Sequence, residues 1–112
     1  MVNAVYILKT KNSSYKNVKA VMKFISARTR FMPGCLQSEI WQNTETSGIM
    51  LYESWRSMKD LEMHIVSPLY KQMLAALELS SVEPVISFYE IEKICGIDLI
   101  EEVLVKQKNF II

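Results

Sequence analysis

The sequence of 112 residues predicts a single α+β domain in which strands and helices follow one another in the order β-α-β-β-α-β. Short β-branched and aromatic runs, bounded by turn residues, mark four strands. Two longer segments carry apolar residues at helical spacing. A short polar turn joins the middle two strands into an antiparallel hairpin. Half of the residues are apolar, so a domain of this length can bury a core without metal or disulfide staples.

The first strand is predicted over residues 4–9, and the first helix ends near residue 31. The polar run Asn12-Ser13-Ser14 supplies an N-cap for this helix, and Pro33-Gly34 ends it. The helix is amphipathic, and its apolar stripe consists of Val18, Met22, Ile25 and Thr29.

The hairpin consists of predicted strands over residues 35–42 and 49–56, joined by a polar turn over 43–48. Both of its faces are apolar. We assign Leu36, Ile40, Ile49, Leu51 and Trp55 to one face, and Cys35, Trp41, Met50 and Tyr52 to the other. A sheet with one face in water alternates more cleanly between apolar and polar residues. The second face is therefore expected to be covered as well, which predicts a homodimer.

The second helical segment is predicted in two parts. Ser57-Met58-Lys59-Asp60 resembles a capping box and starts the first part, which carries Leu61, His64 and Ile65 on one face. Ser67-Pro68 starts the second part, whose apolar residues are Leu69, Met73, Leu74 and Leu77. Pro84 then precedes a fourth strand over residues 85–91. This order predicts the ferredoxin-like fold, a four-stranded antiparallel sheet with two helices on one face.

A C-terminal extension follows the predicted domain of residues 1–95. Residues 97–107 are predicted to form a short helix with an apolar stripe made of Ile97, Ile100, Val103 and Leu104. The tail over 109–112 is also apolar. Exposed, such a segment would be sticky, so we expect residues 96–112 to pack on the same chain or on a neighbouring one.

Composition argues against several classes of protein. The net charge is +1 and the basic residues are scattered, which gives no electrostatic case for binding nucleic acid or an anionic membrane. No apolar run approaches the roughly 20 residues that span a bilayer, and the N-terminus does not resemble a signal peptide, so we expect a cytoplasmic protein. Cys35 and Cys95 are expected to be free thiols. A single histidine predicts that no metal is bound.

Four motifs in the middle of the chain resemble the antibiotic biosynthesis monooxygenase family in their order and spacing. They are Pro33-Gly34-Cys35-Leu36, Tyr52-Glu53-Ser54-Trp55, Asp60-Leu61-Glu62-Met63-His64 and Ser67-Pro68-Leu69-Tyr70. The resemblance spans residues 4–92 and implies a dimer whose sheets pack into an α/β barrel. Some members of this family oxygenate quinol-like or polyketide aromatic molecules with dioxygen, without metal or flavin. Relatives that degrade haem use a histidine in the region where this chain has residues 72–76, which contain none, so no cofactor is expected.

The candidate catalytic residues are His64 and Glu53, and the candidate substrate-binding residues are Trp55, Tyr70 and Met73. His64 is either a general base toward a phenolic oxygen or a packed histidine that bonds the backbone or Glu53. Glu53, expected opposite Ser38, either transfers protons or fixes the helix. The three others either line an aromatic pocket or fill the core. Both interpretations place Glu53, Trp55 and His64 close together.

Two functions follow from these alternatives. The first is a cofactor-independent monooxygenase that acts on a small aromatic, quinol-like or polyketide-type molecule. The second is a dimeric barrel that binds a small ligand, or has a structural role, without turnover.

Overall fold

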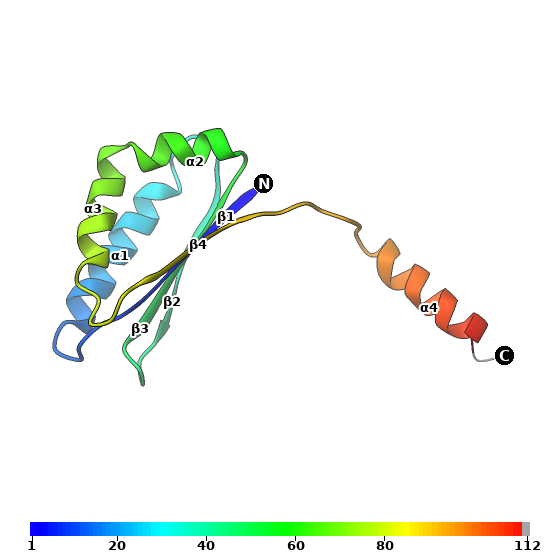
Figure 1. Ribbon diagram of the computed structural model, residues 1–112, viewed down its shortest axis with the longest axis horizontal. Helices are drawn as coiled ribbons and strands as arrows, with labels where there is room; N and C mark the ends of the chain where they lie inside the picture. Colours follow the sequence, from blue (N-terminus) through cyan, green and yellow to red (C-terminus); the bar gives the residue numbers. More distant parts are fainter. Residues whose placement is uncertain (111–112) are drawn as a thin grey trace.

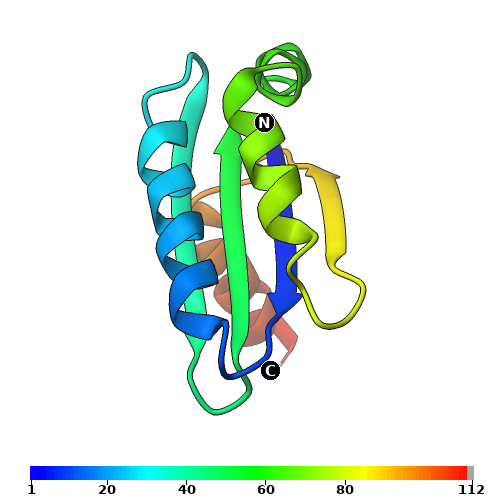
Figure 2. The same cartoon turned by 90° about the vertical axis from the view of Figure 1, so that its left-hand side faces the viewer.

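A computed structural model describes residues 1–110, with the side chains of residues 1–108. The elements are β1 (Val2–Lys9), α1 (Tyr15–Thr29), β2 (Cys35–Asn43), β3 (Gly48–Trp55), α2 (Met58–Ile65), α3 (Pro68–Leu77), β4 (Val85–Glu90) and α4 (Asp98–Phe110). The strands form one antiparallel sheet in the order β2-β3-β1-β4. The helices α1 and α3 lie side by side on one face of the sheet (Figures 1 and 2). The predicted ferredoxin-like fold is confirmed.

The main core lies between this sheet face and the helices. Along β1 the side chains alternate, so that every second one points toward α1 and α3 and is buried. Tyr6 of β1 pairs with Leu51 of β3, which places both in the centre of the core. The predicted stripe of α1 is buried as expected, and consists of Val18, Met22, Ile25 and Thr29. Residue Ser38 lies opposite Glu53, also as predicted.

The predicted faces of the hairpin are wrong at the start of β2. A β-bulge between Cys35 and Gln37 adds one residue to this strand, and a bulge shifts the following side chains relative to the preceding ones. Leu36, which we assigned to the core face, is therefore 57% exposed. Cys35 takes its place and packs against Trp55 and Leu61.

Two local predictions in the helices are also wrong. Ser14 occupies the N-cap position of α1, but its helical backbone angles leave its side chain without a capping hydrogen bond. Ile65 was assigned to the same buried face as Leu61 and His64, but it is exposed. Ile65 is the last residue of α2, where the chain bends into α3, so no element covers it.

The start of α2 is held by the predicted capping residues. Ser57 Oγ accepts a hydrogen bond from the Asp60 backbone N–H at 3.2 Å. It also donates to the Asp60 carboxylate at 2.8 Å, and Arg56 pairs with the same carboxylate at 3.1 Å. The hydrogen bond from Ser57, followed by that from Arg56, lowers the pKa of Asp60 below its usual range.

This lowered pKa predicts a pH-dependent contribution of Asp60 to stability. The carboxylate stabilises the fold above its ordinary pKa of about 4, and this contribution is lost as the pH falls through the lowered pKa of the folded state. Wild type should therefore be more stable than Asp60→Asn near neutral pH, and the difference should shrink in acid. Urea unfolding across that range measures it. In a Ser57→Ala background, which should itself cost about 1 kcal/mol, the pH-dependent difference should be smaller; an unchanged difference would contradict the assignment to Ser57.

The opposite face of the sheet carries no helix among residues 1–110. Its apolar side chains are Val5, Ile7, Trp41, Met50, Tyr52, Val85 and Tyr89. We call this surface the open face.

α4 lies apart from the domain on the side of the open face, as both views show (Figures 1 and 2). Its packing partner stays a prediction, and Ile111 and Ile112 of the apolar tail lie outside the described residues. None of the helices in this description has the length and apolar character needed to cross a membrane.

Candidate functional site

The five predicted site residues all lie in the layer between the sheet and the helices. Glu53 and Trp55 come from the inward face of β3, His64 from the last turn of α2, and Tyr70 and Met73 from α3. Four of them are fully buried, and Tyr70 is 6% exposed. Side-chain caps fix where these two helices begin, since Ser57 accepts a hydrogen bond from the Asp60 N–H in α2 and Ser67 accepts one from the Tyr70 N–H in α3.

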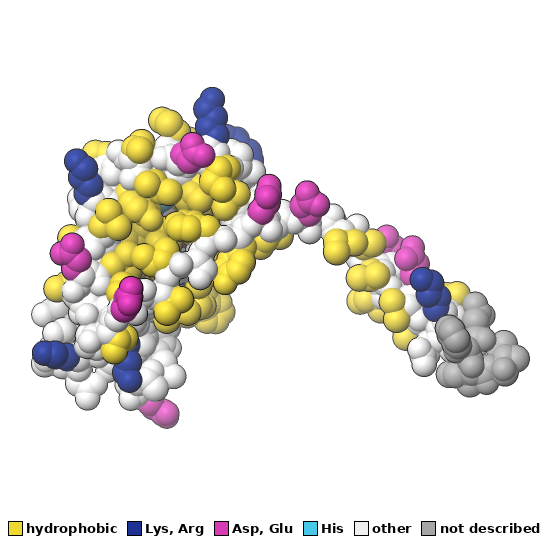
Figure 3. Space-filling model, in the orientation of Figure 1, with side chains coloured by type: hydrophobic (Ala, Val, Ile, Leu, Met, Phe, Trp, Pro, Cys, Tyr) yellow, Lys and Arg dark blue, Asp and Glu magenta, His cyan; other side chains and the backbone are white. Residues whose placement is uncertain are grey.

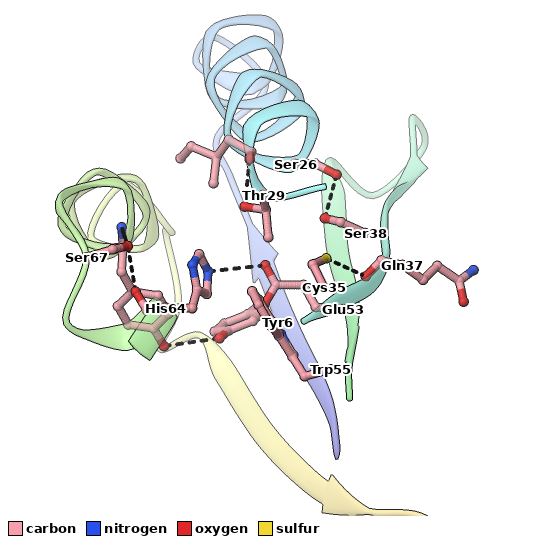
Figure 4. A network of polar contacts seen from close by, with 12 residues as sticks. Tyr6, Ser26, Thr29, Cys35, Gln37, Ser38, Glu53, Trp55, His64 and Ser67 are labelled. Atoms are coloured by element: carbon pink, nitrogen blue, oxygen red, sulfur yellow. Dashed lines mark hydrogen bonds and ion pairs between the residues drawn. The ribbon is translucent and has the colours of Figure 1, made fainter. Parts of the chain in front are cut away.

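Glu53 and His64 form a buried polar pair at the centre of this layer (Figure 4). His64 Nε2 lies 3.7 Å from Glu53 Oε2, and neither side chain is exposed to solvent. Within the described part of the chain, Glu53 Oε2 and both His64 nitrogens have no hydrogen-bond partner. Buried polar atoms are nearly always paired, so three such atoms on two neighbouring side chains make this pair the candidate functional site.

Trp55 contacts both members of this pair. Its indole ring stacks on the His64 imidazole with ring centroids 4.6 Å apart. Its Nε1–H donates a hydrogen bond of 3.2 Å to Glu53 Oε1. Trp55 therefore fixes the plane of the His64 ring by stacking and the position of the Glu53 carboxylate by its hydrogen bond.

A pair of tyrosines borders the Glu53–His64 pair. The hydroxyls of Tyr6 and Tyr70 lie 3.1 Å apart, and the Tyr70 ring packs edge-on against His64. Burial, reinforced by the charge of Glu53, raises the pKa of Tyr6 far above its usual value. Burial also raises the pKa of Tyr70. Both phenols therefore stay neutral at physiological pH and serve as hydrogen-bonding groups rather than as bases.

Tyr6 was not among the predicted site residues. The alternation of side chains along β1 places Tyr6 on the inward face with Ala4 and Leu8. This alternation was the one feature of the sequence that could have identified it. Its partner Tyr70 lies 64 positions further along the chain, so only the folded chain shows the pair.

The tyrosine pair predicts a non-additive effect on stability. Tyr70→Phe should destabilise the protein by about 1–3 kcal/mol, because it leaves the Tyr6 hydroxyl buried without a partner. The double variant Tyr6→Phe/Tyr70→Phe should regain most of this loss, since both polar groups are then gone. A double-mutant cycle in urea measures the coupling; additive losses would contradict it.

Two grooves open on the surface beside α2 and α3; the first contains a site residue, His64, and the second contains none. The first, the His64 groove, has a volume of about 420 Å³ and reaches His64 between the end of α1 and α2; it is lined by Met32, Pro33, Asp60, Met63, His64, Val66 and Ser67. The second has a volume of about 590 Å³ and lies between α3 and β4. Hydrophobic side chains gather in this region of the surface (Figure 3), among them Leu74 and Ile86, which line the second groove. Met73 and Trp55 line neither groove.

The described side chains give less support to a metal site or to a cysteine nucleophile. Among the side chains of residues 1–108, no three His, Cys, Asp or Glu residues cluster as metal ligands would. Both cysteines are free. Burial, followed by the charge of Glu53, raises the pKa of Cys35, which keeps this thiol protonated and makes it a poor nucleophile.

Comparison with known proteins matches this architecture to one family. The family model for "Antibiotic biosynthesis monooxygenase" matches residues 16–76, which is more than half of the chain. This stretch covers α1 apart from its first residue, α2, and α3 apart from its last residue, and it includes all five predicted site residues. A search of the curated proteins finds no match.

Solved structures with the same fold include proteins named as candidate antibiotic biosynthesis monooxygenases. One from Deinococcus radiodurans has a TM-score of 0.77 at 19% identity, over 86% of this chain and 97% of its own. One from Caulobacter crescentus CB15 has a TM-score of 0.73 at 23% identity, over 82% and 90%. One from Nitrosomonas europaea has a TM-score of 0.74 at 16% identity, over 83% and 100%. The structural likeness supports the fold, and the match of the family model over residues 16–76 shows that the chain belongs to the antibiotic biosynthesis monooxygenase family.

Proposed function

We propose that this protein is a cofactor-independent monooxygenase that oxidises a small aromatic, quinol-like or polyketide-type molecule. The observation that carries the proposal is the buried Glu53–His64 pair, whose unpaired polar atoms lie beside an apolar groove. Family membership supports the reaction class, and the substrate class is our inference from the site.

The proposed first step is removal of a proton from a phenolic hydroxyl of the substrate by His64. The Nε2 atom of His64 faces Glu53, so the Nδ1 atom is the one available to the substrate. The Glu53 carboxylate and the stacked Trp55 ring both stabilise the imidazolium that forms. In this buried layer such electrostatic support is stronger than in bulk water.

The deprotonated substrate is an electron-rich anion that reduces dioxygen directly. One oxygen atom is added to the substrate carbon, and the other leaves as water together with the two hydrogens that the substrate loses. The protein contributes a proton acceptor, an apolar surrounding and the exclusion of water. Tyr6 and Tyr70 stay protonated and bond each other beside the pair, so they do not remove protons from the substrate.

The substrate reaches His64 through the His64 groove. The exposed side chains of Met63 and Val66 lie at its rim, and their displacement opens the way to the buried imidazole. Methionine is flexible and polarisable, which suits a surface that has to adapt to a planar aromatic ring.

Oxygen uptake with a panel of quinols and hydroxylated polycyclic aromatics tests the proposal, with the rate without protein subtracted. Glu53→Gln and His64→Gln should each lower the rate by about 10²–10⁴-fold, which is the usual contribution of a general base. Glu62→Gln serves as a matched control, since Glu62 lies exposed on the same helix as His64 and lines neither groove. A rate that is equal in wild type and in both site variants would refute the proposed role of the pair.

One observation favours the second function, a ligand-binding or structural module without turnover. Trp55 and Met73 are fully buried and line neither groove beside the site, so they fill the space that a large substrate would need. Under this alternative the quinols bind, as seen by quenching of tryptophan fluorescence, while oxygen uptake stays at the background rate.

The proposed enzyme is a homodimer that buries the open face. Several apolar residues of this face are strongly exposed in one chain, with Trp41 57%, Val85 56% and Tyr89 52% exposed. Sheets pack face to face at a separation of about 10 Å, and a second copy offers an identical apolar sheet. Analytical ultracentrifugation measures the mass in solution; a monomer at micromolar concentration would contradict the dimer.

A further inference from the structure

We infer that α4 is an exchanged arm that packs against the β2 edge of the partner copy in the dimer. The inference rests on the proposed dimer and adds to it a second, separate contact between the two copies.

The first observation is that the apolar stripe of α4 is exposed to solvent. All of its described side chains, from Asp98 to Lys108, are exposed. Its apolar stripe is formed by Ile97, which precedes the helix, and by Ile100, Val103 and Leu104, each 54–73% exposed. A helix of 13 residues is marginal in water without tertiary contacts. The stripe therefore indicates that α4 packs on an apolar surface.

The second observation is the shape of the chain. The radius of gyration is 18.4 Å, whereas a compact domain of this length has about 13 Å. The longest dimension is 61 Å, against 35 and 21 Å for the others. The large radius of gyration is due to the segment after Glu90. This segment leaves the sheet and places α4 on the side opposite α1 and α3 (Figure 1). This is the side on which a partner copy packs.

The strand order determines which part of the partner α4 reaches. β4 and β2 form the two edges of the sheet. We place the two-fold axis of the proposed dimer along the strands, an arrangement that brings β4 of one copy opposite β2 of the other. The chain that leaves β4 then passes along the partner's β2 edge. The open face of its own sheet is no longer available to α4, since the partner sheet covers it.

The β2 edge exposes apolar side chains against which the apolar stripe of α4 can pack. Leu36 and Trp41 are its two large exposed hydrophobic residues, each 57% exposed. Trp41 also belongs to the open face, so the surface that α4 covers is continuous with the proposed interface between the sheets. An isolated edge strand that exposes hydrophobic residues invites aggregation. An arm that covers Leu36 and Trp41 removes this hazard.

Charges along the two elements are complementary in the same orientation. α4 begins with acidic residues and ends with basic ones, in the order Asp98, Glu101, Glu102, Lys106 and Lys108. Arg30, the C-cap residue of α1, reaches β2 at Ser38, where its Nε–H donates a hydrogen bond to the Ser38 carbonyl. Glu39 and Glu45 follow further along β2 and its turn. An α4 that runs from the start of β2 toward the turn places opposite charges next to each other.

Photo-crosslinking of the full-length purified protein tests the arm. A benzoylphenylalanine at position 100, in the apolar stripe, should give covalent dimers whose crosslink maps by mass spectrometry to residues 35–43. Mixing ¹⁵N-labelled and unlabelled copies before irradiation distinguishes crosslinks between copies from those within one copy. Leu104→Glu should weaken the dimer by about tenfold or more and abolish the crosslink. Val105→Glu, which adds the same charge on the other side of α4, is the matched control and should change neither.

The outcomes separate the arm from the proposed dimer. A dimer whose crosslinks at position 100 fall within one copy, or outside residues 35–43, overturns the arm and leaves the dimer intact. A monomer in ultracentrifugation overturns both. Equal effects of Leu104→Glu and Val105→Glu also overturn the arm, because only Leu104 belongs to the stripe.

Discussion

Replacing Glu53 and His64 together with Met and Phe is expected to separate the two roles of this pair. Glu53→Met alone should destabilise the protein by roughly 3–5 kcal/mol, because removing one member of a buried pair leaves the other without compensation. Adding His64→Phe should recover at least about 1–2 kcal/mol of this loss, since the phenyl ring keeps the stacking on Trp55 and needs no polar partner. Activity should stay about 10²–10⁴-fold below wild type in both variants.

The comparison between single and double variants removes a complication at Trp55. The Nε1–H of Trp55 loses its acceptor in every variant that lacks Glu53, so this loss cancels when Glu53→Met is compared with the double variant. Urea unfolding gives the free energies, and oxygen uptake with quinols gives the rates. Recovery of activity together with stability would show that the pair only holds the fold.

Replacing Gly34 with alanine is expected to have the largest effect on stability outside the site. Gly34 has a φ of +80°, in the left-handed region that L-residues avoid. A Cβ at this position would lie 2.5 Å from Asp60 Oδ2, so the N-terminus of α2 would have to move. The conformational cost of about 1–3 kcal/mol and an overpacking cost of similar size add to roughly 3 kcal/mol or more.

Gly96→Ala is the matched control for this substitution. A Cβ at Gly96 would lie 3.5 Å from Asp98 Oδ1, an ordinary contact. Thermal unfolding should show a large drop for Gly34→Ala and little change for Gly96→Ala. Similar melting temperatures for the Gly34→Ala variant and wild type would contradict the proposed close approach between Gly34 and α2.

Local patterns along the chain were enough to predict the fold. Helical spacing predicted the buried stripe of α1, and the capping residues Ser57 and Ser67 predicted where α2 and α3 begin. These signals are local because a helix or a turn forms between residues close in sequence. Strand alternation also placed Glu53 and Trp55 on one face, and the symmetry of the turn placed Ser38 opposite Glu53.

Some features depend on contacts that no local pattern encodes. The bulge between Cys35 and Gln37 exchanged Cys35 for Leu36 in the core, because the packing of Trp55 and Leu61 selects the side chain that fills the space. The tyrosine pair joins β1 to α3, and its members are 64 positions apart. Periodicity identifies which side chains point inward, but not which of them meet.

The sequence by itself determined the elements, their order and the residue types in the site. Only the tertiary structure decided that Glu53 and His64 meet in a buried layer and have polar atoms there without hydrogen-bond partners among the described residues. It also decided that α4 lies away from its own domain with its apolar stripe exposed. The physical reason is the same in both cases. Burial and pairing are properties of surfaces brought together by the fold, whereas propensity and spacing act between neighbours in the chain.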